Sequence, residues 1–186
     1  LEIYGELMID DFQPEFGLRS PFHWGSKWGI LLGFYYIDPF SLPDTDVRVE
    51  YAFVNQYAYT HDPMDTTYTH YYSVIGHHIG ADADNLFVDV RHRFTDKLQM
   101  AVSYERERHG EGNVNKPHPK DAPWEEEWEF LSGVTESTNS LSLGGSYATI
   151  GRYFADLKYT VSWVKNISNK LGENSTRHQV LLSGQY

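Results

Sequence analysis

Residues 153–163 read Tyr-Phe-Ala-Asp-Leu-Lys-Tyr-Thr-Val-Ser-Trp, and this stretch decides the fold. Every second residue, from Tyr153 through Leu157 to Trp163, is apolar, whereas the residues between them include Asp156 and Lys158. Side chains along a β-strand point alternately to opposite faces, so a strand formed here has one apolar and one polar face. The stretch therefore predicts a strand that separates two different environments.

The same period of two recurs along the whole chain. We expect strands at residues 1–9, 27–37, 46–59, 85–94, 97–107, 137–149, 153–165 and 177–186. Three of the links are short: 38–45, 95–96 and 150–152. Four are long: 10–26, 60–84, 109–136 and 166–176. Short and long links alternate strictly, as in outer-membrane barrels, which have short periplasmic turns and long outer loops.

This pattern predicts an all-β fold, an antiparallel transmembrane β-barrel, of which eight strands are present here. The alternative is a soluble β-sandwich, because its strands also have one wet face. A sandwich, however, has no reason to sort its long and short links to opposite ends. Eight strands could close into a small barrel filled by side chains, but we prefer eight strands of a wider one.

The composition narrows the class further. The chain of 186 residues has a net charge of −11, and its mean hydropathy is −0.52. The longest apolar run, residues 29–37, is too short for a membrane-spanning helix. The aromatic fraction of 16% suits aromatic girdles at membrane interfaces or surfaces that stack on sugars. The absence of cysteine excludes disulfides, and the acidic charge argues against nucleic acid as a partner.

The two ends of the sequence also carry a signal. The alternating pattern begins at Leu1, and it continues through the final strand to an aromatic residue, Tyr186. A terminal strand with a final aromatic residue is usual in bacterial outer-membrane barrels. We therefore expect a single domain over residues 1–186, located in the bacterial outer membrane of a Gram-negative cell. We expect it to be the C-terminal half of a longer chain, the alternative being a trimmed mature start.

The strand phase assigns side chains to two faces of the barrel. The apolar face should contact lipid, and it includes Leu98, Met100, Val102, Leu157, Val161 and Leu182. The opposite face should line the lumen, and it carries Arg48, Glu50, Asp89, Arg91, Arg93, Glu105, Asp156 and Lys158. Charges of both signs in facing rows are typical of a lumen filled with ion pairs and water.

The sequence does not favour an enzyme. It contains no nucleophile-elbow serine, no HExxH motif and no phosphate-binding glycine loop, so we assign no catalytic residue. His77 and His78, followed by Asp82 and Asp84, offer groups that zinc or calcium could use. Loop histidines more often bind backbone groups, so we assign no metal and no cofactor there. Ca²⁺ bound by the acidic loops is left open.

Part of the sequence resembles a known family. The residues that carry the resemblance are Glu50-Tyr51, Tyr59-Thr60-His61, Tyr68-Thr69-His70, Gly76-His77, Gly80 and Asp82-Ala83-Asp84, preceded by Tyr4-Gly5-Glu6 and Asp10-Asp11-Phe12. This stretch is similar to the hallmark region of the Wzi-like capsule-assembly family. The resemblance implies an outer-membrane barrel of about eighteen strands. The best-known members of that family act as surface lectins that attach group 1 capsular polysaccharide to the cell, whereas many relatives belong to genomes without that capsule system.

Two functions follow as hypotheses. The first is a Wzi-like protein whose outer loops bind or anchor surface polysaccharide, because sugars need aromatic faces and clustered hydrogen-bonding groups. Its candidate ligand-binding residues are Tyr59, His61, Tyr68, His70, His77, Asp82, Asp84, Trp124 and Trp128. We expect the residues of 60–84 to share one glycan surface with both tryptophans. The second hypothesis is a porin-like channel or a structural subunit of a larger assembly with outer-membrane lipid and other membrane proteins as partners.

Overall fold

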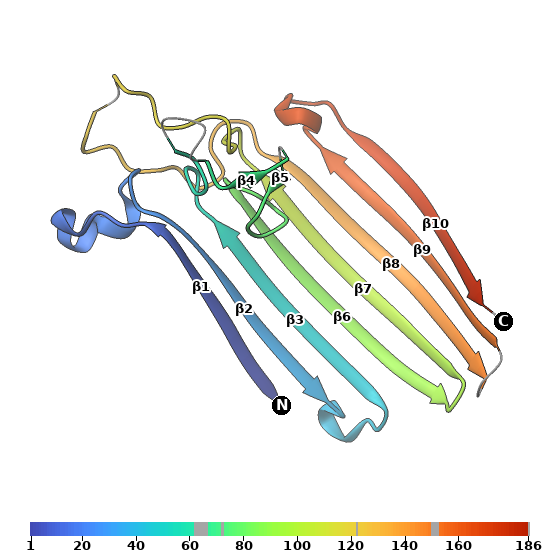
Figure 1. Cartoon of the computed structure of the whole chain (residues 1–186). Coiled ribbons are helices and arrows are strands. Elements are labelled where there is room, and N and C mark those ends of the chain that lie inside the picture. The colour runs from blue at the N-terminus through green and yellow to red at the C-terminus, as the bar shows by residue number, and fades with distance from the viewer. Residues whose placement is uncertain (62–66, 72, 122, 150–152, 186) are drawn as a thin grey trace.

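The protein forms one open antiparallel sheet of eight strands (Figure 1). The computed structural model describes residues 1–61, 67–71, 73–121, 123–149 and 153–185. The strands, in their order across the sheet, are β1 (Glu2–Asp11), β2 (Lys27–Ile37), β3 (Thr45–Val54), β6 (Ala83–Thr95), β7 (Leu98–His109), β8 (Glu136–Thr149), β9 (Tyr153–Lys165) and β10 (Ser175–Gln185). Spatial order follows chain order, and β1 and β10 form the two edges, so in the described residues the sheet does not close into a barrel.

The remaining elements are short and lie in the links. They are the 3₁₀ helices η1 (Pro14–Phe22), η2 (Pro39–Ser41) and η4 (Ile167–Asn169), and the two-residue strands β4 (Thr69–His70) and β5 (Ser73–Val74). Among the described residues, no helix is both long and apolar enough to cross a membrane. The helices η1 and η4 and the β4–β5 pair all lie at one end of the sheet, which we call the loop end (Figure 1). The opposite end, which carries η2, is called the turn end.

The register confirms the predicted strand phase. Partner residues in a ladder lie on the same face, and apolar residues pair with apolar residues from strand to strand. Ile30 pairs with Phe53, and Val102 pairs with both Val90 and Leu143. Further along the sheet, the predicted apolar residues Leu157, Val161 and Leu182 follow in the same row. One face is therefore mainly apolar, as the sequence predicts; contact with lipid stays a prediction.

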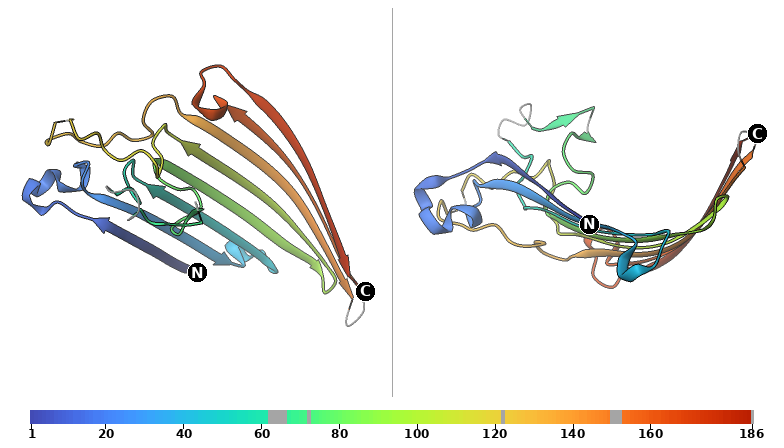
Figure 2. Two further views of the ribbon diagram at one scale, coloured as in Figure 1. Left: turned by 45° about the horizontal axis from the view of Figure 1, so that its top comes forward. Right: turned by 90° about the horizontal axis from the view of Figure 1, so that it is seen from below.

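The second face carries the predicted charged row. All eight predicted lumen residues lie on it: Arg48, Glu50, Asp89, Arg91, Arg93, Glu105, Asp156 and Lys158. Figure 2 shows that the sheet is curved and that the β4–β5 segment lies on its concave side. The segment covers Glu6, Met8 and Val54 of the polar face, so this face is the concave one. Curvature of this kind is what a segment of a barrel wall requires.

The observed strand bounds differ from the predicted ones mainly at β3. The sequence predicts a strand over 46–59, but β3 ends at Val54. The side chain of the next residue, Asn55, is buried and donates to the carbonyl oxygen of Ser26 at 2.6 Å, which turns the chain out of the ladder. Tyr59 has a positive φ of 68°, which a strand does not allow. The 150–152 link and the terminal Tyr186 lie outside the described residues.

The buried core of the molecule lies at the loop end. It consists of Ala52, Val54, Ala58, Tyr59, Ile79, Ala81 and Ala83, with Met8, Val74 and Val114 packed against it. These residues come from β1, β3 and β6 and from the links that follow β3 and β7. Burial of apolar side chains between the sheet and its own loops fixes the loops in place. This core positions the groups described next.

Candidate functional site

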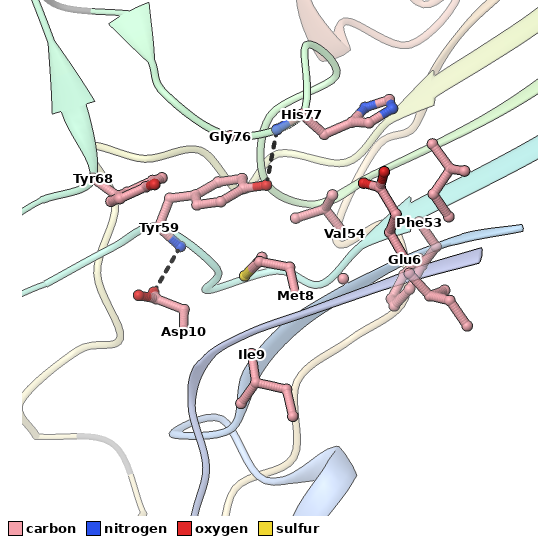
Figure 3. Close-up of a pocket in the computed structure, with 13 residues that line it drawn as sticks. Glu6, Met8, Ile9, Asp10, Phe53, Val54, Tyr59, Tyr68, Gly76 and His77 are labelled. Carbon is pink, nitrogen blue, oxygen red and sulfur yellow. Dashed lines mark hydrogen bonds between the residues drawn. The ribbon is translucent and has the colours of Figure 1, made fainter. Parts of the chain in front are cut away.

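The link between β3 and β6 folds back over the concave face, with Tyr59 at its centre (Figure 3). The backbone N–H of Tyr59 donates to Asp10 Oδ2 on β1 at 3.2 Å, and its hydroxyl accepts from the N–H of His77 at 3.1 Å. The Tyr68 ring stacks on the Tyr59 ring at a centroid distance of 5.9 Å. Between this link and the sheet is a cavity of about 500 Å³, which we call the concave cavity.

Burial controls the ionisation of the groups at the concave cavity. Burial raises the pKa of Tyr59, although the hydrogen bond from the His77 N–H opposes this effect. Burial lowers the pKa of His77, and the neighbouring His78 lowers it further. Both side chains are thus held in their neutral forms near neutral pH. The cavity offers hydrogen-bonding groups and an aromatic wall.

Two predicted ligand residues, Asp82 and Asp84, are buried and bind parts of the protein. Asp82 is 1% exposed, and it accepts hydrogen bonds from Ser132 Oγ at 2.5 Å and from the N–H of Gly112 at 2.8 Å. Asp84 is fully buried, and its two oxygens accept from Arg108 Nε and Nη2 at 2.8 and 2.6 Å. Asp82 therefore ties together the two longest links, and Asp84 ties β6 to β7.

A second cavity, which we call the aromatic cavity, opens between three links at the loop end. It has a volume of about 560 Å³, and its walls include Trp24, Tyr57, His118 and Trp124. The Trp24 and His118 rings stack at 4.0 Å, and the Trp124 ring lies edge-on to Trp24 at 5.4 Å. Lys27 and His61 also line it. Flat aromatic faces beside polar groups are the surfaces that bind sugar rings and their hydroxyls.

Polar contacts hold the aromatic cavity in shape. The His23 ring, 1% exposed, bonds through Nε2 to the carbonyl oxygen of Trp124 at 2.6 Å. Lys27 Nζ donates to the Thr60 carbonyl oxygen at 2.5 Å, so the start of β2 is joined to the link that follows β3. Burial raises the pKa of Tyr57, and the carboxylates of Glu126 and Glu129 raise it further, so the phenol stays protonated.

Trp128 lies on the other side of the sheet. Its indole N–H donates to the Pro21 carbonyl oxygen at 2.8 Å, and its ring lies 5.6 Å from Phe53 and 6.1 Å from Trp28. Phe53 and Trp28 belong to the apolar, convex face. The chain thus crosses the end of the sheet between Trp124 and Trp128. The expected single glycan surface containing both tryptophans is not formed.

The remaining predicted ligand residues divide between the two cavities. Tyr59, Tyr68 and His77 line the concave cavity, and His61 lies with Trp124 in the aromatic cavity. His70 is exposed, with its ring 4.4 Å from that of Tyr71. The predicted set did not include Trp24, Lys27 and His118. Trp24 and Lys27 lie in the aromatic-rich run at residues 22–28, and this run could have indicated them as ligand residues.

Two pairs of opposite charges form on the concave face of β3 and β6. Arg48 Nη2 and the Tyr4 hydroxyl donate to Glu50 Oε1 at 2.7 and 2.6 Å. Arg91 Nε donates to Asp89 Oδ2 at 2.6 Å. Each such pair keeps two charges close together on a face that is otherwise lined by serine, threonine and glycine in β8 and β9. The concave face is therefore polar but nearly balanced in charge along β3 and β6.

The fold and loops together define an all-β protein with one open, curved antiparallel sheet whose long links gather at one end. The sequence of residues 1–179 matches the family described as capsule assembly protein Wzi. The match covers nearly the whole chain, so the chain belongs to the Wzi capsule-assembly family, as its sequence motifs predicted. No curated protein and no solved structure matches it.

Proposed function

We propose that this protein is part of an outer-membrane β-barrel that holds surface polysaccharide through its loop end. The observation that carries the proposal is the aromatic cavity, where Trp24, Tyr57 and Trp124 surround a space of about 560 Å³. This volume falls in the usual range of ligand pockets and is sufficient for a few sugar rings. Membership in a capsule-assembly family supports surface polysaccharide as the ligand class.

The electrostatics of the cavity support the same ligand class. The chain has a net charge of −11, which disfavours an acidic glycan at most of its surface. The aromatic cavity is different, since Lys27 and Lys120 line it together with His61 and His118, which pair with Asp10 at 3.3 Å and with Glu126 at 2.8 Å. A cavity with basic groups beside aromatic faces accepts both the carboxylates and the apolar ring faces of an acidic polysaccharide.

The test replaces the aromatic faces and leaves the sheet intact. Trp24→Ala combined with Trp124→Ala removes two stacking contacts, each worth roughly 1 kcal/mol, so binding of purified surface polysaccharide should weaken about tenfold or more. Cells with the double variant should shed more polysaccharide while their level of folded protein stays normal. Trp163→Ala is the matched control, because Trp163 lies on the convex face of β9. Unchanged binding in the double variant would refute the proposal.

A channel is the second candidate, and the charged rows of the concave face favour it. Asp89 and Arg91 pair at 2.6 Å on the wall that would line a lumen. Substituting Asp89→Asn or Arg91→Gln should change the uptake of small charged solutes if solutes pass along this face. If uptake shifts and polysaccharide retention does not, the channel is the better description of the protein.

A further inference from the structure

A cluster of three metal-ligating side chains lies on the concave face, outside both cavities. His78, Glu105 and Glu107 each bring one ligand atom to within 4.8 Å of the others. The two glutamates are two residues apart on β7, so they point to the same face. His78 reaches them from the link that folds over this face after β5 (Ser73–Val74). Folding thus unites groups that are distant in the sequence.

The spacing of the cluster suits an ion better than a direct hydrogen bond. His78 Nε2 and Glu107 Oε2 are 3.9 Å apart, beyond hydrogen-bonding distance. A zinc-type ion binds nitrogen and carboxylate oxygen at about 2.0–2.2 Å, which places neighbouring ligand atoms about 3–4 Å apart. The observed distance therefore leaves room for an ion between the two side chains.

Neighbouring residues orient both carboxylates. Asn85 Nδ2 on β6 donates to Glu105 Oε1 at 2.9 Å. His109 Nε2 bonds to Glu107 Oε1 at 2.8 Å, so the oxygen nearest to His78 is the other one, Oε2. Metal-ligating groups in proteins are usually fixed in this way by a second layer of hydrogen bonds. The carboxylates are thus oriented before any ion arrives.

The charge at the cluster also favours a cation. Within the described part of the chain, the ion-pair partners of Glu107 are the imidazoles of His78 and His109. The arginines of β7, Arg106 and Arg108, alternate with the glutamates and contact Asp84 on the opposite face. Two carboxylates that lie close together on one face repel each other, and a divalent cation bound between them would relieve this repulsion.

We propose that His78, Glu105 and Glu107 bind a divalent transition-metal ion of the zinc type. One imidazole with two carboxylates is a ligand set that Zn²⁺ accepts, whereas Ca²⁺ prefers six to eight oxygen ligands. Three protein ligands leave at least one coordination position for water or another ligand. The bound ion joins the link before β6 to β7, so it stabilises the loop that covers the concave face.

The test uses the full-length protein in detergent, stripped of metal with a chelator and titrated with Zn²⁺ by calorimetry. We expect one ion per chain at this site, and His78→Gln and Glu107→Gln should each weaken its affinity at least tenfold. His70→Gln and Glu6→Gln are the matched controls, because His70 is exposed in β4 (Thr69–His70) and Glu6 lies on the concave face of β1. Both controls should bind Zn²⁺ as the unmodified protein does.

A second measurement separates metal binding from folding. The change in gel mobility on heating reports whether each variant is folded. Because His78 is exposed, its replacement should leave the fold intact. Zn²⁺ should slow amide exchange at Ile79 and Gly80 in the unmodified protein and have no such effect in folded His78→Gln. Equal Zn²⁺ affinity in folded His78→Gln and the unmodified protein would overturn the proposal. An equal loss in His70→Gln would also overturn it.

Discussion

The two ends of the sheet differ in how far their apolar side chains are buried. At the loop end, Tyr59, Ala81 and Val54 are buried between the sheet and its links. These residues lie on the concave side, whereas toward the turn end the convex face leaves Val102 49% exposed and Leu182 75% exposed. A water-soluble protein rarely leaves so extended an apolar surface uncovered. The loop end is therefore stabilised by its own core, whereas the apolar row of the convex face has no such cover among the described residues.

The polar groups follow the same division. On the convex face, the apolar row stops at Asp84 and Arg108, which pair with each other close to the loop end. Beyond this point, the links carry the hydrogen bonds of Asp82, Asn55 and His23. The change from apolar to polar along one face thus coincides with the start of the links. The following substitutions test whether the two ends depend on different forces.

The largest effect is expected for Asp84→Ala at the loop end. The substitution removes a fully buried carboxylate, so Arg108 loses the two hydrogen bonds that it donates to Asp84. Removing one partner of a buried ion pair costs about 3–5 kcal/mol of unfolding free energy. Urea unfolding in detergent or lipid measures this cost. Asp156→Ala is the control, because its carboxylate accepts a hydrogen bond from Ser183 Oγ at the exposed edge strand. An equal loss of unfolding free energy in both variants would contradict the difference between the two ends of the sheet.

The next effect tests the convex face directly. Val102→Arg should cost about 2–4 kcal/mol in a lipid bilayer, whereas Ser103→Arg should cost much less. The two residues are neighbours on β7, but Val102 pairs with Val90 on the apolar face and Ser103 pairs with Asp89 on the concave face. Unfolding in lipid vesicles provides the comparison. If both substitutions cost the same, the convex face does not contact lipid.

A smaller effect is expected for Gly76→Ala in the link over the concave face. An added Cβ would lie 2.3 Å from the Tyr59 ring, so the link must shift. Such overpacking costs about 1–3 kcal/mol. Gly145→Ala in β8 is the control, because its Cβ would meet nothing within 4 Å, and the change should be neutral or slightly stabilising. Amide exchange in residues 76–80 should rise only in Gly76→Ala.

The smallest effect is expected for Tyr59→Phe. The substitution removes the acceptor of the His77 N–H, and the loss of one such hydrogen bond costs about 1 kcal/mol. Exchange of the His77 amide should therefore accelerate about fivefold. Tyr147→Phe, at an exposed position of β8, should not change it. No acceleration in Tyr59→Phe would show that the link is held by packing alone.

The strands could be predicted from the sequence because their period of two depends on each strand alone. Leu157, Val161 and Lys158 lie on the predicted faces, and β2 and β9 have the predicted bounds. The prediction for β3 was wrong after Val54, because alternation continues to Tyr59 while the backbone turns. That turn depends on Asn55 and Ser26, which are 29 residues apart. A contact between residues so far apart leaves no signal in the local sequence pattern.

The candidate site was harder to predict for the same reason. Trp124 and Trp128 are four residues apart in sequence and equally aromatic, yet they lie at the aromatic cavity and on the convex face. Asp82 and Asp84 have the composition of a ligand loop, but buried donors occupy their oxygens. In each case the outcome depends on how three long links pack against one another. Strand periodicity contains no information about that packing.

The order of the strands has an evolutionary consequence. Within the eight-stranded sheet, each strand pairs with the sheet strand that precedes it along the chain. Each hairpin is therefore a unit that lies beside the previous one. A gene can therefore gain or lose a hairpin without disturbing the pairing of the others. The diameter of a barrel grows roughly linearly with the number of its strands. The width of the wall can thus evolve in steps of two strands while the concave cavity, built from β1, β2, β3 and the link after β3, stays the same.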